Sequence, residues 1–187
     1  MLTAPVRLVR HSLAHWPGPE LIVTAACMPG AGGAGECRFE VAGDLGAVVV
    51  PRLDQPARTD ELWRHTCFEV FLARHGAPGY LEFNFSPSRR WAAYAFVGYR
   101  VPAPPPTVAA PAIHVEATAG SLSLTAIVGT GAWPEPGGGD LEIGLAAVVE
   151  ASDGTLGYFA LRHPAERPDF HDRGGFALTL GRTAMAS

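Results

Sequence analysis

The sequence predicts an all-β fold, a single-domain antiparallel β-sandwich of the jelly-roll type over residues 1–187. Short apolar or alternating segments recur at even spacing along the chain, and Gly, Pro, Ser or Asp bound most of them. Almost no stretch has the periodicity of an amphipathic helix. With 48% hydrophobic and 17% charged residues, a chain of 187 residues is long enough for one substantial core and short for two domains.

The segments expected to form strands are, in chain order, residues 6–10, 20–27, 37–43, 46–50, 66–73, 80–86, 91–97, 112–119, 121–129, 141–151, 156–162 and 176–180. The turns between them agree with this assignment. Residues 119–121, "AGS", join two alternating segments, and residues 152–155, "SDGT", contain an Asp-Gly pair that suits a tight hairpin. Gly- or Pro-rich residues near 28–36, 101–111 and 133–140 are expected to form surface loops.

Charge and residue usage exclude several functional classes. The net charge is −4, and all 14 basic residues are arginine. No basic run could follow a phosphate backbone, so we expect no nucleic-acid partner. The absence of lysine also removes the residue on which Schiff-base enzymes and phosphate-binding loops depend.

The sequence predicts a soluble cytoplasmic protein without a membrane partner. Residues 1–20 lack the continuous apolar stretch that follows a basic start in a secretory signal. Later apolar runs are too short to span a bilayer. Cys27, Cys37 and Cys67 form an odd set without CxxC spacing, so we expect buried, reduced thiols rather than a disulfide framework or a structural zinc site.

The hairpin expected from residues 66–73 and 80–86 is the centre of a candidate site. Side chains of a strand alternate between its two faces. If Phe68 and Phe83 face the core, the same register places Glu69 on the opposite face. The other polar and aromatic side chains expected on that opposite face are Tyr80, Glu82, Asn84 and Ser86.

The following strand is expected to add an aromatic surface. Continued alternation across the turn "SPSRR" predicts Tyr94 and Phe96 on the core side and Trp91 on the polar face. Carboxylate, amide and indole groups around a shallow depression suit a sugar, which offers hydroxyl donors and a flat ring face. We therefore predict a non-catalytic module that binds a carbohydrate or a similar polyhydroxylated small molecule. The candidate ligand-binding residues are Glu69, Tyr80, Glu82, Asn84, Arg90 and Trp91.

Two other interpretations of this face remain open. The outer face of a sandwich is normally polar, so the two glutamates are also compatible with a structural or protein-interaction domain, in which they are solvated or paired with nearby arginines. Glu69 and Glu82 could also act as a general acid and base in a glycoside-processing enzyme. Side chains on neighbouring antiparallel strands lie roughly 4.5 to 8 Å apart, which is compatible with such a pair.

Three stretches carry a resemblance to a known family: "LWRHTCFEVFL", "YLEFNFSPSRRWAAYAF" and "LRHPAERPDFHDRGGFAL". They resemble the bacterial DOMON-like proteins, whose β-sandwich is similar to that of family 9 carbohydrate-binding modules. The resemblance covers residues 54–180 and is strongest in the central hairpins. It implies a jelly-roll scaffold that binds a small ligand such as a sugar or haem, and it assigns no role to individual residues.

No cofactor is expected, and haem, zinc, iron and calcium are the alternatives. Haem-binding relatives use a Met and a His as axial ligands, whereas Met28 lies in a Gly-rich loop and the other methionines are near the termini. The loop from His163 to Asp172 contains two His and two Asp residues that could bind zinc or iron, or calcium through Asp169 and Asp172. The alternative is that these side chains cap the backbone of an ordered loop.

Overall fold

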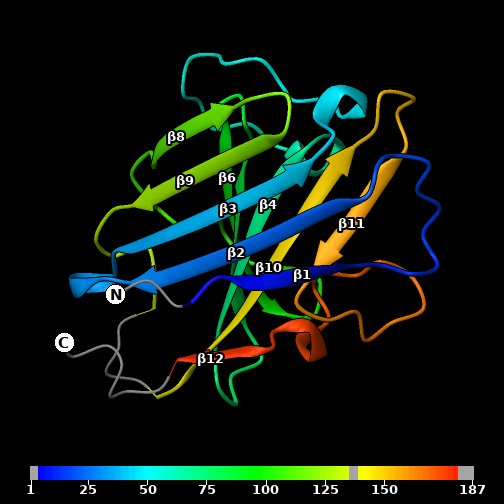
Figure 1. Ribbon diagram of the computed structural model, residues 1–187. Coiled ribbons are helices and arrows are strands. Elements are labelled where there is room, and N and C mark those ends of the chain that lie inside the picture. Colours follow the sequence, from blue (N-terminus) through cyan, green and yellow to red (C-terminus); the bar gives the residue numbers. More distant parts are fainter. Residues whose placement is uncertain (1–3, 135–138, 181–187) are drawn as a thin grey trace.

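Two antiparallel sheets pack face to face in the computed structural model, which describes residues 4–134 and 139–180 (Figure 1). Sheet A consists, in spatial order, of β1 (Val6–Arg10), β2 (Leu21–Pro29), β3 (Gly35–Gly43), β9 (Ser121–Val128) and β8 (Ala112–Ala117). Sheet B consists of β7 (Val101–Pro102), β6 (Trp91–Gly98), β5 (Tyr80–Phe85), β4 (Cys67–Arg74), β10 (Leu141–Glu150) and β11 (Leu156–Ala160), with β12 (Leu178–Leu180) paired to the start of β10. The predicted antiparallel β-sandwich is confirmed.

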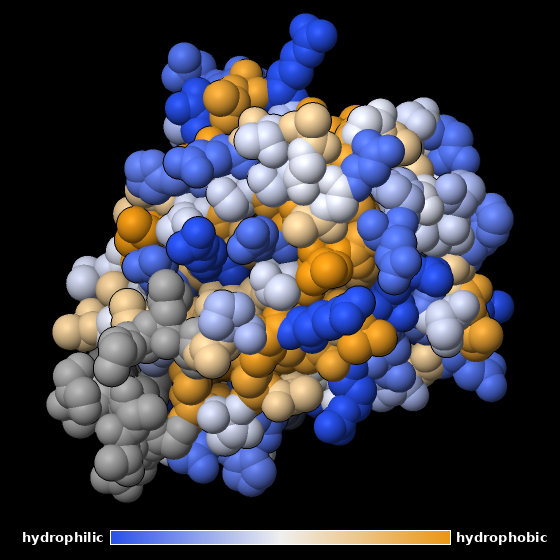
Figure 2. All heavy atoms as spheres, in the orientation of Figure 1, coloured by the Kyte–Doolittle hydropathy of each residue, from blue (hydrophilic) through white to orange (hydrophobic). Residues whose placement is uncertain are grey.

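Strand β1 links the two sheets. Its first half, Val6 to Leu8, pairs with β2 of sheet A, and its second half, Val9 and Arg10, pairs with β11 of sheet B. Figure 1 shows that the strands of sheet A cross those of sheet B. The face that carries sheet A has hydrophilic and hydrophobic residues interspersed (Figure 2).

The core lies between the sheets and follows the period-two alternation of both. Phe39 on β3 stacks on Phe68 on β4, with ring centres 4.9 Å apart. Both rings are fully buried. Burying side chains of this size supplies most of the driving force for joining the sheets. The largest fully buried side chains are Phe39, Phe68, Phe71, Phe83, Phe85, Leu8, Leu72, Leu122, Leu124, Ile143, Leu145 and Val23.

The strands expected over residues 46–50 and 176–180 differ most from the structure. Residues 46–50 do not form a strand: the short 3-10 helix η2 (Leu45–Ala47) is capped by Asp44, and Val48 makes an isolated bridge to Ala151. Of residues 176–180, only Leu178–Leu180 form a strand. Of the loop expected near 28–36, only residues 30–34, with the 3-10 helix η1 (Ala31–Gly33), form the turn between β2 and β3; Met28, expected in the loop, lies in β2 and pairs with Glu36. Part of the expected loop near 133–140 lies outside the described residues.

All three cysteines are buried, as expected, and Cys27 lies directly opposite Cys37 in the β2–β3 pair. Burial raises the pKa of the Cys27 thiol to about 12 and holds the pKa of Cys37 well above its usual range. Within residues 4–134 and 139–180, no helix has the length and hydrophobicity needed to cross a membrane.

The predicted faces of β6 are wrong. Trp91 lies directly opposite Phe85, and residues opposite each other in a sheet share a face. An odd number of residues, 86–90, separates the paired ends, so odd positions of β5 meet odd positions of β6. Trp91 therefore belongs to the main core, with 6% of its surface exposed, whereas Tyr94 shares the outer face with Glu82.

A comparison of two tryptophans tests this assignment. Trp91→Ala should lower the free energy of unfolding by roughly 3 to 5 kcal/mol, because it leaves a cavity in the core. Trp63, which is 44% exposed, provides the matched control. Trp63→Ala should change the free energy of unfolding by less than about 1 kcal/mol in urea denaturation. Equal losses for the two variants would contradict the burial of Trp91.

Candidate ligand-binding site

A pocket of about 750 Å³ opens on the outer face of sheet B. Side chains of β4, β5, β6, β10 and β11 form its floor, and two connecting segments and the β6–β7 turn form its walls. The floor residues are Glu69, Glu82, Tyr94, Phe96, Val148 and Tyr158. The wall residues are Asp60, Glu61, Trp63, Arg100, Arg167, Pro168, Phe170 and His171.

Strand register places the two glutamates close together on the floor. Glu69 lies opposite Asn84, and Glu82 lies opposite Phe71 and Tyr94. Glu69 and Glu82 are thus diagonal neighbours on adjacent strands, whose side chains are within reach of one another. The pocket therefore has two carboxyl groups and the phenol of Tyr94 on adjacent parts of one floor.

The first wall is held against β6 by backbone and side-chain hydrogen bonds. The Thr59 backbone N–H donates to the Trp91 carbonyl oxygen at 2.8 Å. The Tyr94 hydroxyl donates to the Asp60 carboxylate at 2.9 Å, and Arg58 forms an ion pair with the same carboxylate at 3.0 Å. These contacts fix the segment that leads into the wall.

The 3-10 helix η3 (Leu62–Arg64) presents Trp63 at the rim of the pocket. Leu62 is buried beneath it, whereas Trp63 is partly exposed. The guanidinium carbon of Arg64 lies 5.1 Å from the centre of a Trp63 ring. Glu61 enters this helix with a φ of 61°, in the left-handed region that is unfavourable for residues other than glycine. The strain indicates that the position of the rim is held by its surroundings.

A second left-handed residue, Arg100 with a φ of 53°, connects the opposite wall to sheet B. Its guanidinium lies 2.8 Å from Asp169, and the Tyr99 hydroxyl donates to the same carboxylate. The Arg100 backbone N–H donates to the Tyr80 hydroxyl at 3.1 Å, and this hydroxyl is hydrogen-bonded to His171 Nδ1 at 2.7 Å. Strained residues of this kind concentrate at functional sites.

The loop considered as a metal site has a structural role in the described residues. His163 is hydrogen-bonded to a backbone carbonyl of β1 at 2.7 Å, and Asp172 accepts a backbone N–H at η5 (Arg173–Gly175). Asp169 and His171 bind Arg100 and Tyr80 instead. Among residues 4–134 and 139–180, no group of three or more His, Cys, Asp or Glu is placed to hold a metal ion.

The two carboxyl groups are strongly desolvated. Glu69 and Glu82 are 4% and 5% exposed. Burial, followed by the charge of Glu82, holds the pKa of Glu69 well above its usual range. Burial raises the pKa of Glu82 to about 7, against the opposing effects of the Asn84 hydrogen bond, at 2.8 Å, and of Arg100. At neutral pH the pair therefore retains bound protons.

His171 is a neutral group in this site. Burial, followed by the charge of Arg100, lowers its pKa to about 4. Its ring is packed edge-on against Phe71, Tyr80 and Phe96, with ring centres between 5.1 and 5.8 Å apart. Its Nε2 lies 3.7 Å from Glu82, so a neutral imidazole borders the carboxyl pair.

The six predicted ligand-binding residues lie in different parts of the structure. Glu69 and Glu82 line the pocket. Tyr80 and Asn84 are buried and do not line it: Tyr80 contacts His171, and Asn84 donates to Glu82. Trp91 is in the core, so its predicted role as the stacking surface is wrong.

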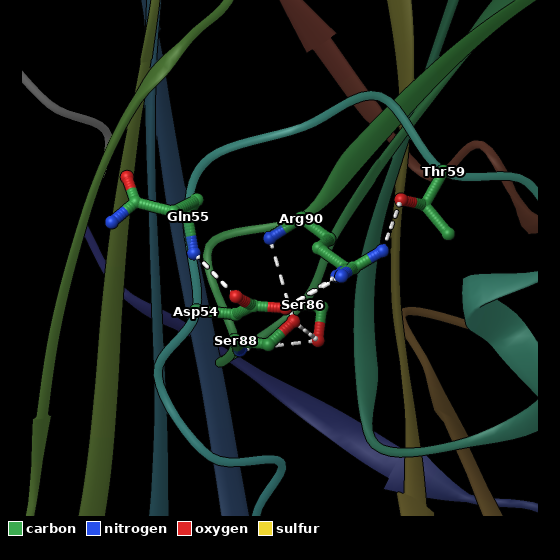
Figure 3. Close-up of polar contacts among 6 residues, drawn as sticks. All are labelled: Asp54, Gln55, Thr59, Ser86, Ser88 and Arg90. Carbon is green, nitrogen blue, oxygen red and sulfur yellow. Dashed lines mark hydrogen bonds and ion pairs between the residues drawn. The ribbon is translucent and has the colours of Figure 1, made fainter.

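Arg90 lies outside the pocket lining and supports a wall from a distance. Its guanidinium binds the Asp54 carboxylate at 2.5 Å and the Thr59 hydroxyl at 3.2 Å (Figure 3). In Figure 3 the Arg90 side chain lies between Asp54 and Thr59. The Asp54 backbone N–H also donates to the Ser88 carbonyl at 3.0 Å. Arg90 thus fastens the segment before Trp63 to the β5–β6 turn.

Sequence reasoning missed most aromatic residues of the pocket. Tyr94 and Phe96 would have been found from the odd length of the β5–β6 turn. Trp63, Tyr158 and Phe170 come from segments far apart in the sequence, and no local pattern marks them as neighbours.

Comparison with known proteins supports the fold. No protein-family profile and no curated protein sequence matches the chain. The structure is similar to that of a protein from Bacteroides uniformis to which carbohydrate binding is provisionally ascribed, with a TM-score of 0.63 and 17% identity over 93% of this chain and 85% of that one. It is also similar to a family 9 carbohydrate-binding module from Caldicellulosiruptor kristjanssonii solved with cellotriose, with a TM-score of 0.51 and 9% identity over 82% of this chain and 71% of that one. The chain therefore shares the sandwich fold of these proteins.

Proposed function

We propose that this protein is a non-catalytic carbohydrate-binding module and that the pocket on sheet B holds the sugar. The observation that carries the proposal is the combination of aromatic side chains around the pocket with buried polar groups on its floor. Trp63 at the rim offers a flat apolar ring to a pyranose face, and Glu69 and Glu82 offer hydrogen bonds to hydroxyl groups. The carbohydrate-related names of the two proteins with similar folds support it.

Glycoside cleavage is the second candidate, because the raised pKa values of Glu69 and Glu82 suit a general acid. A hydrolase that uses two carboxyl groups needs one protonated and one ionised, with environments that push their pKa values apart. Here burial raises both pKa values, and Glu82, with a pKa of about 7, is only partly ionised at neutral pH. An assay for released shorter sugars therefore separates the two candidates.

Calorimetric titration with neutral mono- and oligosaccharides, cellotriose included, tests the proposal. We expect saturable binding without release of shorter sugars. Trp63→Ala should weaken binding roughly five- to tenfold through loss of ring stacking, whereas Trp63→Phe should retain most of the affinity. Leu53→Ala, at an exposed apolar residue earlier in the same segment, is the matched control. Release of shorter sugars that stops in both Glu69→Gln and Glu82→Gln would instead establish an enzyme, and no binding of any sugar would refute the proposed function.

The protonation of Glu82 predicts a specific dependence of stability on pH. Its pKa is about 7 in the folded chain and near 4.5 when unfolded, so between these values folding takes up a proton and stability falls as the pH rises. Relative to Glu82→Gln, the wild-type protein should lose roughly 2 to 3 kcal/mol of unfolding free energy between pH 5 and pH 7.5.

Urea denaturation at both pH values measures this loss. His171, whose pKa shifts in the opposite direction, is present in both proteins and so cancels in the difference. Glu116→Gln, on exposed β8, removes the same charge and should follow the wild type. Parallel behaviour of wild type and Glu82→Gln would show that Glu82 is not desolvated.

A further inference from the structure

The carboxyl group of Glu69 lines the pocket without a protein partner. Glu69 is buried, with an exposed fraction of 4% for the whole residue. No hydrogen bond or ion pair joins it to another residue in the described part of the chain. Glu82, on the adjacent strand, uses Oε1 to accept from Asn84, while its Oε2 is 3.7 Å from His171. Buried carboxyl groups are costly unless they are paired, protonated or bound to a ligand.

The positive groups around the pocket do not neutralise this pair. Arg100 attracts both carboxyl groups, but its guanidinium forms an ion pair with Asp169 at 2.8 Å. Arg167 is exposed to solvent. The imidazole of His171 is neutral above about pH 4. The lining therefore contains two buried acids and no dedicated cation within the described residues.

The remaining ionisable groups near the floor do not alter this balance. Asp60 and Glu61, in the first wall, are each paired with an arginine at 3.0 Å. The phenols of Tyr80 and Tyr94 and the thiol of Cys67 are neutral at pH 7, because burial raises their pKa values. A positive charge that complements the pair would have to come from the ligand.

We propose that the pocket selects a sugar that carries a protonated amine and that Glu69 and Glu82 together bind this ammonium group. The inference rests on the function proposed above and specifies the class of sugar. An ammonium group has three donors, which suits two carboxyl groups on neighbouring strands. The aromatic side chains of the pocket also favour a cation, because the face of an aromatic ring attracts positive charge.

Binding of an amine should release protons from the carboxyl pair. At pH 7 burial keeps Glu69 protonated and Glu82 partly protonated in the empty pocket, and an ammonium group nearby favours the ionised form of both. Well below pH 7 the amine of an aminosugar is already protonated, so each proton released from the carboxyl pair goes to the buffer. The affinity for the amine should therefore rise between pH 5 and pH 6.5, whereas a neutral sugar should show no such increase.

The decisive experiment compares two trisaccharides by calorimetry on the full chain. Cellotriose and the β-1,4-linked trimer of glucosamine have the same number of rings and the same linkage, and they differ in the hydroxyl or amine at C2. At pH 7 the glucosamine trimer should bind about tenfold more tightly or better, a difference of about 1.4 kcal/mol. Titrations in phosphate and in MOPS, which differ in ionisation enthalpy and contain no primary amine, should reveal the released protons.

Conservative variants locate the effect. Glu69→Gln and Glu82→Gln should each reduce the preference for the amine to less than about threefold, while Glu116→Gln, exposed on sheet A, should retain it. Circular dichroism and the thermal midpoint verify that each variant is folded. If one glutamine variant does not fold, the other and the proton release still test the inference.

Each other outcome is informative. Equal or tighter binding of cellotriose would overturn the amine inference and leave the carbohydrate-binding function standing. A preference that persists in both glutamine variants would show non-specific attraction to an acidic protein and would also overturn it. If neither trisaccharide nor any other sugar binds, both the inference and the proposed function fail.

Discussion

The packing of sheet B against sheet A determines which side chains of β4, β5 and β6 can face the pocket. Phe68 on β4 stacks on Phe39 of the other sheet, and Phe83 and Phe85 on β5 join the same core. A shift of one residue would expose these rings and bury the glutamates between the sheets, which is strongly unfavourable. The core therefore fixes the register, and the register places Glu69 and Glu82 on the outer face.

The outer face of sheet B is divided into two halves with different roles. On one half Phe71, Tyr80 and Phe176 form a second apolar cluster beneath the segment after β11. On the other half the same sheet carries the pocket. The pocket wall formed by the segment after β11 is joined to the β6–β7 turn through the Asp169–Arg100 ion pair. The rigidity of the site thus depends on contacts between segments far apart in the sequence, which tie two loops to one sheet.

The fold was predictable from the sequence because alternation and turn residues are local signals. The β4–β5 hairpin was predicted with the correct faces, since the burial of Phe68 and Phe83 determines the position of Glu69. The error at Trp91 arose because the length of a turn decides the parity of the next strand, and hydrophobicity alone does not reveal it. The walls were not predictable: Asp169 and Arg100 are 69 positions apart, and only the folded chain brings them together.

The presence of two buried carboxyl groups is difficult to explain by stability. Apolar side chains of similar size at Glu69 and Glu82 would extend the neighbouring apolar cluster and avoid the cost of desolvation. Asn84 satisfies one oxygen of Glu82, but its own Oδ1 is buried without a hydrogen-bond partner in the described residues, so this network is incomplete. Incomplete polar networks destabilise a core, yet they provide free hydrogen-bonding groups where a pocket opens beside them. Preorganisation for a polar ligand, as proposed above, would account for this arrangement, because a ligand that satisfies these groups regains the free energy that burial cost.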